Sequence, residues 1–308
     1  MRDAPFPIES LLPIFVYFII GLLLRRRGVA KPEHADFLFR VIFLITLPAL
    51  IFMSVSRANL DRDTALLPIN GFLVNLACAG AAALVARVRR LPREQAGAVV
   101  VCAAIMNMGY MLPFILATRG QAALADAILF DAGNAIFVAV LAYPIAHYYG
   151  HHQAFFTIRT VTKVILSPIF LSIVLALLVN LADIDTGSTL AAALTPLGQA
   201  TLPLMLIAVG VSFGGFSLHS TNSLTAVGIR MALGAALGWL GVWLFGFEGT
   251  TAAVVVVSAA APVGASAAAI TVVSDLNKAV AVNAISMSAL LGLFSTSALL
   301  FITGIVFG

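Results

Sequence analysis

Long apolar stretches alternate with short polar connections along the whole chain. Each stretch has roughly the 20 residues that a helix needs to cross the hydrocarbon core of a bilayer. The pattern predicts an all-α membrane protein with ten transmembrane helices, and no connection is long enough to hold a soluble domain. The whole chain, 1–308, is therefore expected to form one membrane domain. The predicted spans are 8–24, 37–55, 66–86, 96–118, 123–147, 160–181, 190–213, 223–245, 250–273 and 279–307.

The fourth predicted span, 96–118, is interrupted near its middle by Asn107, Gly109 and Pro113. A spanning helix can break at that depth only where the freed backbone groups meet protein or a water-lined cavity. Half-helix ends at the midplane offer N–H groups to an anion and C=O groups to a cation, as they do in secondary transporters. The interruption therefore predicts a transport site.

The sequence also repeats at a fixed interval. Pro13-Ile14-Phe15 recurs 155 positions later as Pro168-Ile169-Phe170, and Thr46-Leu47-Pro48 recurs after the same interval as Thr201-Leu202-Pro203. Applied to the fourth span, the interval leads to 259–266, where proline and glycine interrupt the ninth span. The chain is therefore expected to consist of two related halves.

Each half contains five predicted spans, and five is an odd number. The second half therefore begins on the opposite side of the membrane, and the halves 8–147 and 160–307 are expected to be inverted repeats. The axis that relates such repeats lies in the membrane plane. It would bring together the broken helices 4 and 9, which we expect to cross.

The composition is that of a chain in lipid. Hydrophobic residues make up 61% of the 308 and charged residues 10%, against roughly 45–50% and about 25% in soluble domains. The net charge of +4 comes mostly from basic residues in short connections, so it predicts membrane orientation and not nucleic-acid binding. Cys78 and Cys102 lie inside apolar stretches, which argues against a disulfide framework or a metal site.

Lysine and arginine are distributed unequally between the two sets of connections. Eleven lie in or beside connections that follow odd-numbered spans, and four lie on the opposite side. Because basic residues favour the cytoplasmic side, both termini are expected outside and the connection at 148–159 inside. We expect an integral multi-pass protein of a bacterial inner (plasma) membrane.

Three segments carry a likeness to a known family. They are Leu47-Pro48-Ala49-Leu50-Ile51-Phe52, Asn107-Met108-Gly109-Tyr110-Met111-Leu112-Pro113, and Ala261-Pro262 followed by small residues. These segments resemble the auxin efflux carrier family, which includes plant PIN-type carriers and bacterial carriers assigned to malate or malonate. The likeness extends over all ten predicted spans.

The resemblance implies the fold of bile acid:sodium symporters, in which the two broken helices cross. It also implies a scaffold formed by 8–55 and 160–213, and a transport part formed by 66–147 and 223–307. From the family we expect secondary transport of a small organic anion, a carboxylate, by elevator-type alternating access. Homodimers joined through the scaffold helices are expected as well, as in the PIN-type members.

The interrupted spans supply the expected substrate site. Asn107 offers an amide donor without a buried charge, either as a helix cap alone or as a ligand contact as well. The prolines and glycines shape the opening, since proline lacks a donor and glycine permits close approach of the backbone. The expected substrate-binding residues are Asn107, Met108, Gly109, Tyr110, Pro113, Pro262, Val263, Gly264 and Ser266.

Asp131 is the deepest acidic residue of the predicted spans, and Asn134 lies one turn away. A charge at the centre of a membrane helix costs roughly 2.5–3.5 kcal/mol, so it needs a partner or a function. We expect the two residues to couple a cation to transport, with Na⁺ ahead of H⁺. The alternative is a structural pair between Asp131 and Arg230, although a long arginine side chain more often reaches toward the membrane interface.

Two other classes of function stay open. A receptor that keeps a transporter fold would bind the carboxylate without moving it, but no output domain is predicted. An intramembrane enzyme would need a nucleophile with a partner, and Ser266, Ser286 and Ser288 have none at similar depth besides Asp131. His147 and His151 stand four apart but are expected in a solvated connection. No catalytic residue, no metal site and no cofactor beyond a coupling ion are expected.

Overall fold

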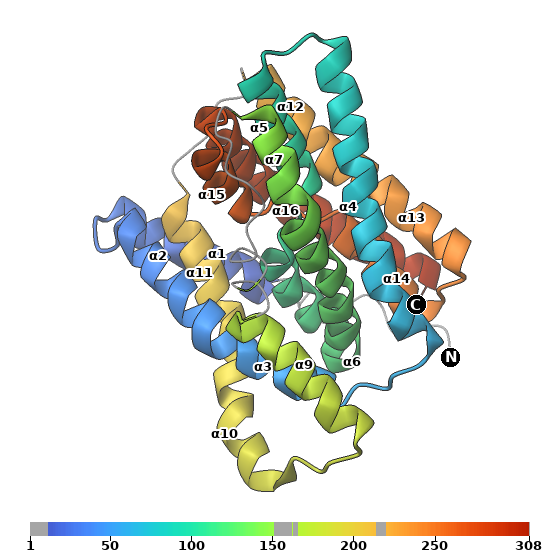
Figure 1. Ribbon diagram of the computed structural model, residues 1–308. Helices are drawn as coiled ribbons and strands as arrows, with labels where there is room; N and C mark the ends of the chain where they lie inside the picture. Colours follow the sequence, from blue (N-terminus) through green and yellow to red (C-terminus); the bar gives the residue numbers. More distant parts are fainter. Residues whose placement is uncertain (1–11, 151–161, 163–165, 214–219, 308) are drawn as a thin grey trace. The chain divides into compact units, whose positions relative to one another are not determined.

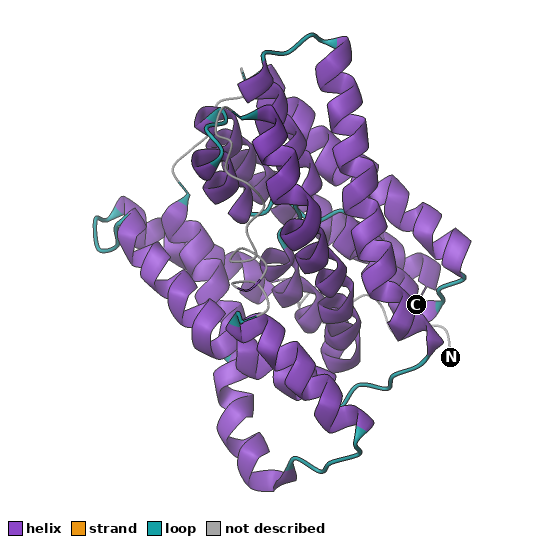
Figure 2. Ribbon diagram, viewed as in Figure 1, coloured by secondary structure: helices purple, strands orange, loops and turns teal. Residues whose placement is uncertain are grey.

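The computed structural model describes residues 12–150, 162, 166–213 and 220–307, and their regular structure is entirely helical (Figures 1 and 2). The predicted all-α class is therefore confirmed for these residues. Within these described ranges, three π-helical turns join successive helices: Ile42–Thr46, Val138–Ala142 and Ile229–Leu233. The helices are α1 Leu12–Arg26, α2 Pro32–Val41, α3 Leu47–Val55, α4 Arg62–Val88, α5 Arg93–Ala104, α6 Met108–Phe137, α7 Tyr143–Tyr149, α9 Pro168–Leu181, α10 Gly187–Gln199, α11 Thr201–Ser212, α12 Thr221–Gly228, α13 Gly234–Phe245, α14 Gly249–Ala259, α15 Ser266–Val273 and α16 Lys278–Phe307.

Six helical segments in the described ranges are long and apolar enough to cross a bilayer. α9 and α14 are apolar but shorter. The chain is thus an integral membrane protein by its helices, while the arrangement of ten spans stays a prediction. The predicted connection at 148–159 lies mostly outside the described residues. The six segments are Pro32–Val55, Arg62–Val88, Met108–Tyr149, Gly187–Ser212, Thr221–Phe245 and Lys278–Phe307.

The backbone repeats the interval found in the sequence. Gly28 and Asp183, which are 155 positions apart, both have positive φ angles, of 71° and 51°. Gly120 and Asp275 are separated by the same 155 positions and have φ angles of 79° and 54°. Positive φ is uncommon outside glycine, so these two pairs support the prediction of two related halves, which stays a prediction.

The chain divides into two compact units, and each has its own packing. The first unit contains 1–61, 112–128 and 163–213, and the second contains 62–111, 129–162 and 214–308. Both units combine segments from the two halves of the sequence. The assignment of 8–55 with 160–213 to a scaffold, and of 66–147 with 223–307 to a transport part, stays a prediction.

In the first unit, α1 and α11 pack through glycine. A Cβ atom added at Gly21 would collide with the carbonyl oxygen of Ile207, and one added at Gly210 would collide with that of Phe18. Small residues at helix contacts let two membrane helices approach closely and gain van der Waals contact. The backbones of α1 and α11 therefore meet where neither helix has room for a side chain.

We expect Gly210→Leu to lower the free energy of unfolding by roughly 1–3 kcal/mol, the usual range for overpacking. Its new side chain would meet backbone atoms, which cannot move aside as a flexible side chain can. Thermal unfolding in detergent measures the effect. Gly80→Leu is the matched control, because a Cβ atom at Gly80 meets nothing within 4 Å. Equal melting temperatures for the two variants would contradict the close contact.

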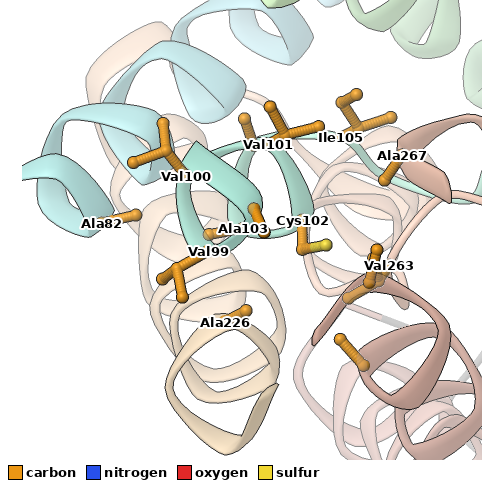
Figure 3. Close-up of a cluster of buried hydrophobic side chains, with 14 of the residues drawn as sticks. Ala82, Val99, Val100, Val101, Cys102, Ala103, Ile105, Ala226, Val263 and Ala267 are labelled. Atoms are coloured by element: carbon orange, nitrogen blue, oxygen red, sulfur yellow. The ribbon is translucent and has the colours of Figure 1, made fainter. Parts of the chain in front are cut away.

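In the second unit, α5 is buried on every side. All of its residues from Ala96 to Ala104 are buried. In Figure 3 the side chains near the end of α5 are surrounded by Ala82, Ala226 and Val263, which belong to other segments of the chain. A helix that is hydrophobic all round belongs in the core. Its 12 residues rise only about 18 Å, too short for the roughly 30 Å of a hydrocarbon core. α5 is therefore a half-helix at the centre of this unit.

Candidate functional site

Two interrupted helices meet in the second unit. α5 ends at Ala104 and α6 begins at Met108, while α14 ends at Ala259 and α15 begins at Ser266. The two connecting segments pair as a single antiparallel bridge between Met106 and Val263. The structure thus brings together the residues of the fourth and ninth predicted spans.

Backbone hydrogen bonds on either side of this bridge join the two segments. The N–H of Asn107 donates to the carbonyl of Pro262 at 2.8 Å, and the N–H of Gly264 donates to the carbonyl of Ile105 at 2.9 Å. A Cβ atom at Gly264 would lie 2.8 Å from the carbonyl oxygen of Met106. Only glycine lets the backbones come this close, which explains its place in the motif.

Two further residues hold the bridge against α16. The N–H of Val263 donates to the hydroxyl of Ser288 at 3.1 Å, and the hydroxyl of Tyr110 donates to the carbonyl of Ala289 at 2.9 Å. Both Ser288 and Tyr110 are buried. In this structure, therefore, Tyr110 anchors the crossover to α16. This use of Ser288 cannot be recognised in the sequence, because its partner is a backbone group.

Asn107 caps the second half-helix. Its Oδ1 accepts a hydrogen bond from the N–H of Tyr110 at 3.2 Å, as an asparagine at the N-cap does. The half-helix therefore begins at Met108, directly after its cap. The side chain of Asn107 is half-buried, and among the described residues its Nδ2 has no recorded acceptor. That donor is free to meet a ligand.

The remaining residues of the expected site differ in exposure. Met108, Pro262 and Val263 are buried, Gly109 is half-buried, and Ser266 is exposed. Pro113 lies within α6, where it lacks the N–H that would bond the carbonyl of Gly109. The accessible edge of the crossover is therefore formed by Asn107 and Gly109 on one segment and Ser266 on the other.

A chain of four polar side chains runs beside the crossover. Nδ2 of Asn134 donates to Asp131 at 2.7 Å, and Nδ2 of Asn75 donates to Oδ1 of Asn134 at 2.9 Å. Nη1 of Arg230 then donates to Oδ1 of Asn75 at 3.1 Å. The alternative raised from the sequence was a direct pair between Asp131 and Arg230. No such pair occurs among the interactions of the described residues. Two amides connect the carboxylate to the guanidinium instead.

Arg230 does not reach toward the membrane interface, and that expectation was wrong: its side chain is 0% exposed. Nη2 donates to the carbonyl of Ala259 at 2.6 Å, and Nη1 donates to the carbonyls of Ala104 and Ala103 at 3.1 and 3.4 Å. These carbonyls belong to the last residues of α14 and α5, where a helix leaves its carbonyls without partners. The ends of two half-helices hold the guanidinium inside the protein.

No group of three or more His, Cys, Asp or Glu side chains that could hold a metal ion occurs in the described part of the chain. His151 lies outside the described residues, so the structure does not test whether His147 and His151 lie in a solvated connection. The polar groups described in this region are amides, hydroxyls, one carboxylate, one guanidinium and helix ends.

Comparison of the sequence with known proteins identifies the family of the chain. The membrane transport protein family matches residues 6–300. An uncharacterized transporter of Methanothermobacter thermautotrophicus is 28% identical over 292 residues, which cover 93% of this chain and 95% of that protein. An uncharacterized transporter of Methanocaldococcus jannaschii is 26% identical over 216 residues, covering 67% and 68%. The chain belongs to the membrane transport protein family, that of the auxin efflux carriers which its sequence resembles.

Proposed function

We propose that this membrane transporter is a secondary transporter of a small organic anion that carries a carboxylate. The observation that carries the proposal is the crossover, where the N-terminus of α6 begins beside the end of α14. A helix N-terminus has free N–H groups and a positive dipole end, which together favour an anion. The Nδ2 group of Asn107 adds a donor at the same place. A site without a fixed positive charge on its accessible edge lets the anion bind and also leave.

Elevator-type alternating access is the proposed mechanism. The division of the chain into two compact units supports it, because the unit that contains the crossover also contains Asp131, Asn134 and Arg230. The turns with positive φ at equivalent positions support two inverted repeats, 8–147 and 160–307. We further propose a homodimer joined through the scaffold helices. Light scattering of the detergent-solubilised protein tests the dimer.

The proposed orientation places both termini outside a bacterial inner membrane. It rests on the distribution of lysine and arginine between the connections. Cysteines introduced in the connection after α1 and in that after α2–α3 should react from opposite sides of sealed membranes. Reaction of both from the same side would contradict the orientation.

Coupling to a cation is proposed at Asp131 and Asn134. Asp131 is half-buried in a membrane helix, and only its Oδ1 is engaged by Asn134 in the recorded interactions. The second carboxylate oxygen is available to Na⁺ or to a proton. Carboxylate and amide oxygens are ligands that suit a hard cation.

Counterflow in proteoliposomes tests the proposed function. Vesicles loaded with unlabelled mono- or dicarboxylates should accumulate the labelled compound transiently and with saturation, in Na⁺ or in K⁺ at two pH values. A screen of melting temperature against the same compounds selects the substrate. Saturable binding without any flux would instead support the alternative, a carboxylate receptor that keeps the transporter fold.

A further inference from the structure

An apolar groove with a volume of about 450 Å³ lies on the second unit and shares no residue with the crossover. α4 lines it with leucine, alanine and glycine, and α7 lines it with proline, isoleucine and two tyrosines. Val100 of the buried helix α5 completes the lining. Since α4 is long and apolar enough to cross a bilayer, the groove lies at the depth of the hydrocarbon chains of the membrane.

One face of α4 leads from the groove to an arginine. Four residues of this face are spaced by three or four positions, which puts them on the same side of the helix: Leu76, Gly80, Ala83 and Arg87. A Cβ atom added at Gly80 would meet nothing within 4 Å, so the groove is open there. From Leu76 to Arg87 the helix rises about 16 Å, roughly half of the 30 Å hydrocarbon core. The groove therefore has the depth of one lipid leaflet, with a positive charge at its end.

α5 places a second arginine at the same end of the groove. Arg93, Gly97 and Val100 share one face of α5 by their spacing, and a Cβ atom at Gly97 would lie 2.5 Å from that of Tyr149 on α7. Nη2 of Arg93 donates to the carbonyl of Tyr148, and its guanidinium lies 5.5 Å from the centroid of the Tyr148 ring. A guanidinium has five N–H donors, so this contact leaves donors that can bind a phosphate group in bidentate fashion.

The charge around this end of the groove is strongly positive. The segment 87–94 contains four arginines and one acidic residue, Glu94. Arg89 donates to the hydroxyl of Thr225 at 2.8 Å, while the side chains of Arg87 and Arg90 have no recorded hydrogen bond or ion pair in the described part of the chain. Basic residues at this position favour an anionic lipid headgroup over one without net charge. Tyrosines, such as the two in α7, are common at the same depth of a membrane.

We propose that the groove between α4 and α7 binds one acyl chain of an anionic phospholipid, whose phosphate lies on Arg87 and Arg93. The apolar lining selects a hydrocarbon chain, and the two arginines select the charge of the headgroup. The site involves neither the crossover nor the transported anion, so it can be tested apart from the transport proposal.

Photolabelling of the purified full-length protein in detergent tests the site. The probe is phosphatidylglycerol with a diazirine on one acyl chain, and mass spectrometry locates the labelled peptides. Label is expected on α4 at 76–83 and on α7 at 144–149, which line the groove. Unlabelled phosphatidylglycerol should remove it at a roughly ten-fold lower concentration than phosphatidylcholine with the same chains, because the arginines attract only the anionic headgroup. Inorganic phosphate alone should not remove it.

Two pairs of variants separate the headgroup from the chain. Arg87→Gln combined with Arg93→Gln should keep the label and lose the preference for phosphatidylglycerol. Arg26→Gln combined with Arg27→Gln is the control, since it removes the same charge from exposed positions of the first unit.

Gly80→Leu should fill the groove and lose the label. Gly228→Leu is its control, because a Cβ atom at Gly228 also meets nothing within 4 Å and this glycine does not line the groove. If the arginine variants fail to fold, the competition in the wild type and the two leucine variants still decide the question.

Three results would overturn the proposal. Equal competition by the two phospholipids would mean that the groove takes any bilayer lipid. Removal of the label by inorganic phosphate would point to a site for the free ion. A wild-type groove without label would mean that something else covers it, such as a second copy of the chain. A wild type that lacks flux but keeps the label would count against the transport proposal alone.

Discussion

Asn107→Ser is expected to weaken carboxylate binding by about ten- to a hundred-fold while leaving the stability of the protein nearly unchanged. Serine is about as good an N-cap as asparagine, so it can still accept from the N–H of Tyr110. It lacks the Nδ2 donor that the structure leaves unused. The loss corresponds to roughly 1.5–3 kcal/mol for a hydrogen bond to a charged group. Isothermal titration with the substrate found in the screen measures it.

Two companion variants separate the cap from the ligand contact. Asn107→Asp also keeps the cap but sets a negative charge against the carboxylate, so it should bind more weakly than Asn107→Ser. Asn107→Ala loses both the cap and the donor, and its unfolding free energy should fall by about 0.5–2 kcal/mol. Normal binding by Asn107→Ser and Asn107→Asp together would place the anion elsewhere and reduce Asn107 to a cap.

Asp131→Asn is expected to abolish the dependence of transport on the coupling ion. An asparagine at this position keeps an oxygen that can accept from Nδ2 of Asn134, so the chain of side chains to Asn75 can persist while the charge is lost. Uptake into proteoliposomes would then no longer rise with Na⁺, or with a proton gradient if the ion is H⁺. The flux of Asp131→Asn should match the wild type without that ion.

Asp36→Asn is the control for this change. It removes the same charge, but from a residue that is exposed in the first unit. It should keep the full ion dependence of the wild type. An unchanged ion dependence in Asp131→Asn would leave Asp131 a structural role at the end of the polar chain. The ion would then have to bind at another place.

The interruption at the crossover could be predicted from the sequence because Asn107 and Gly109 stand out in an apolar run. The first residue of α6 could not be predicted with the same accuracy. An N-cap is defined by the direction of its side-chain oxygen and not by the hydrophobic pattern. The pairing of the two breaks followed from the interval of 155 positions. Their hydrogen bonds are between backbone groups, which leave no mark on residue identity beyond Gly264.

The location of Arg230 shows why the polar interior was harder to predict. Three of its acceptors are carbonyls of Ala103, Ala104 and Ala259, and an alanine gives no sign that its carbonyl binds a cation. From the sequence, Arg230 was therefore expected to extend its long side chain toward the membrane interface. The interval of 155 positions, which leads from Asn75 to Arg230, is the signal in the sequence that relates these two side chains.

The unlike pair at Asn75 and Arg230 has a consequence for how such a chain could have arisen by internal duplication. Two identical halves would have the same residue at both positions. Two arginines would bring two positive charges to within hydrogen-bonding distance of each other, and two asparagines would leave both helix ends without a cation. A functional crossover of this kind therefore requires the two copies to have diverged at this one pair, whatever symmetry they keep elsewhere. The ancestor of either half, standing alone as a symmetric dimer, would have needed a different way to neutralise those ends.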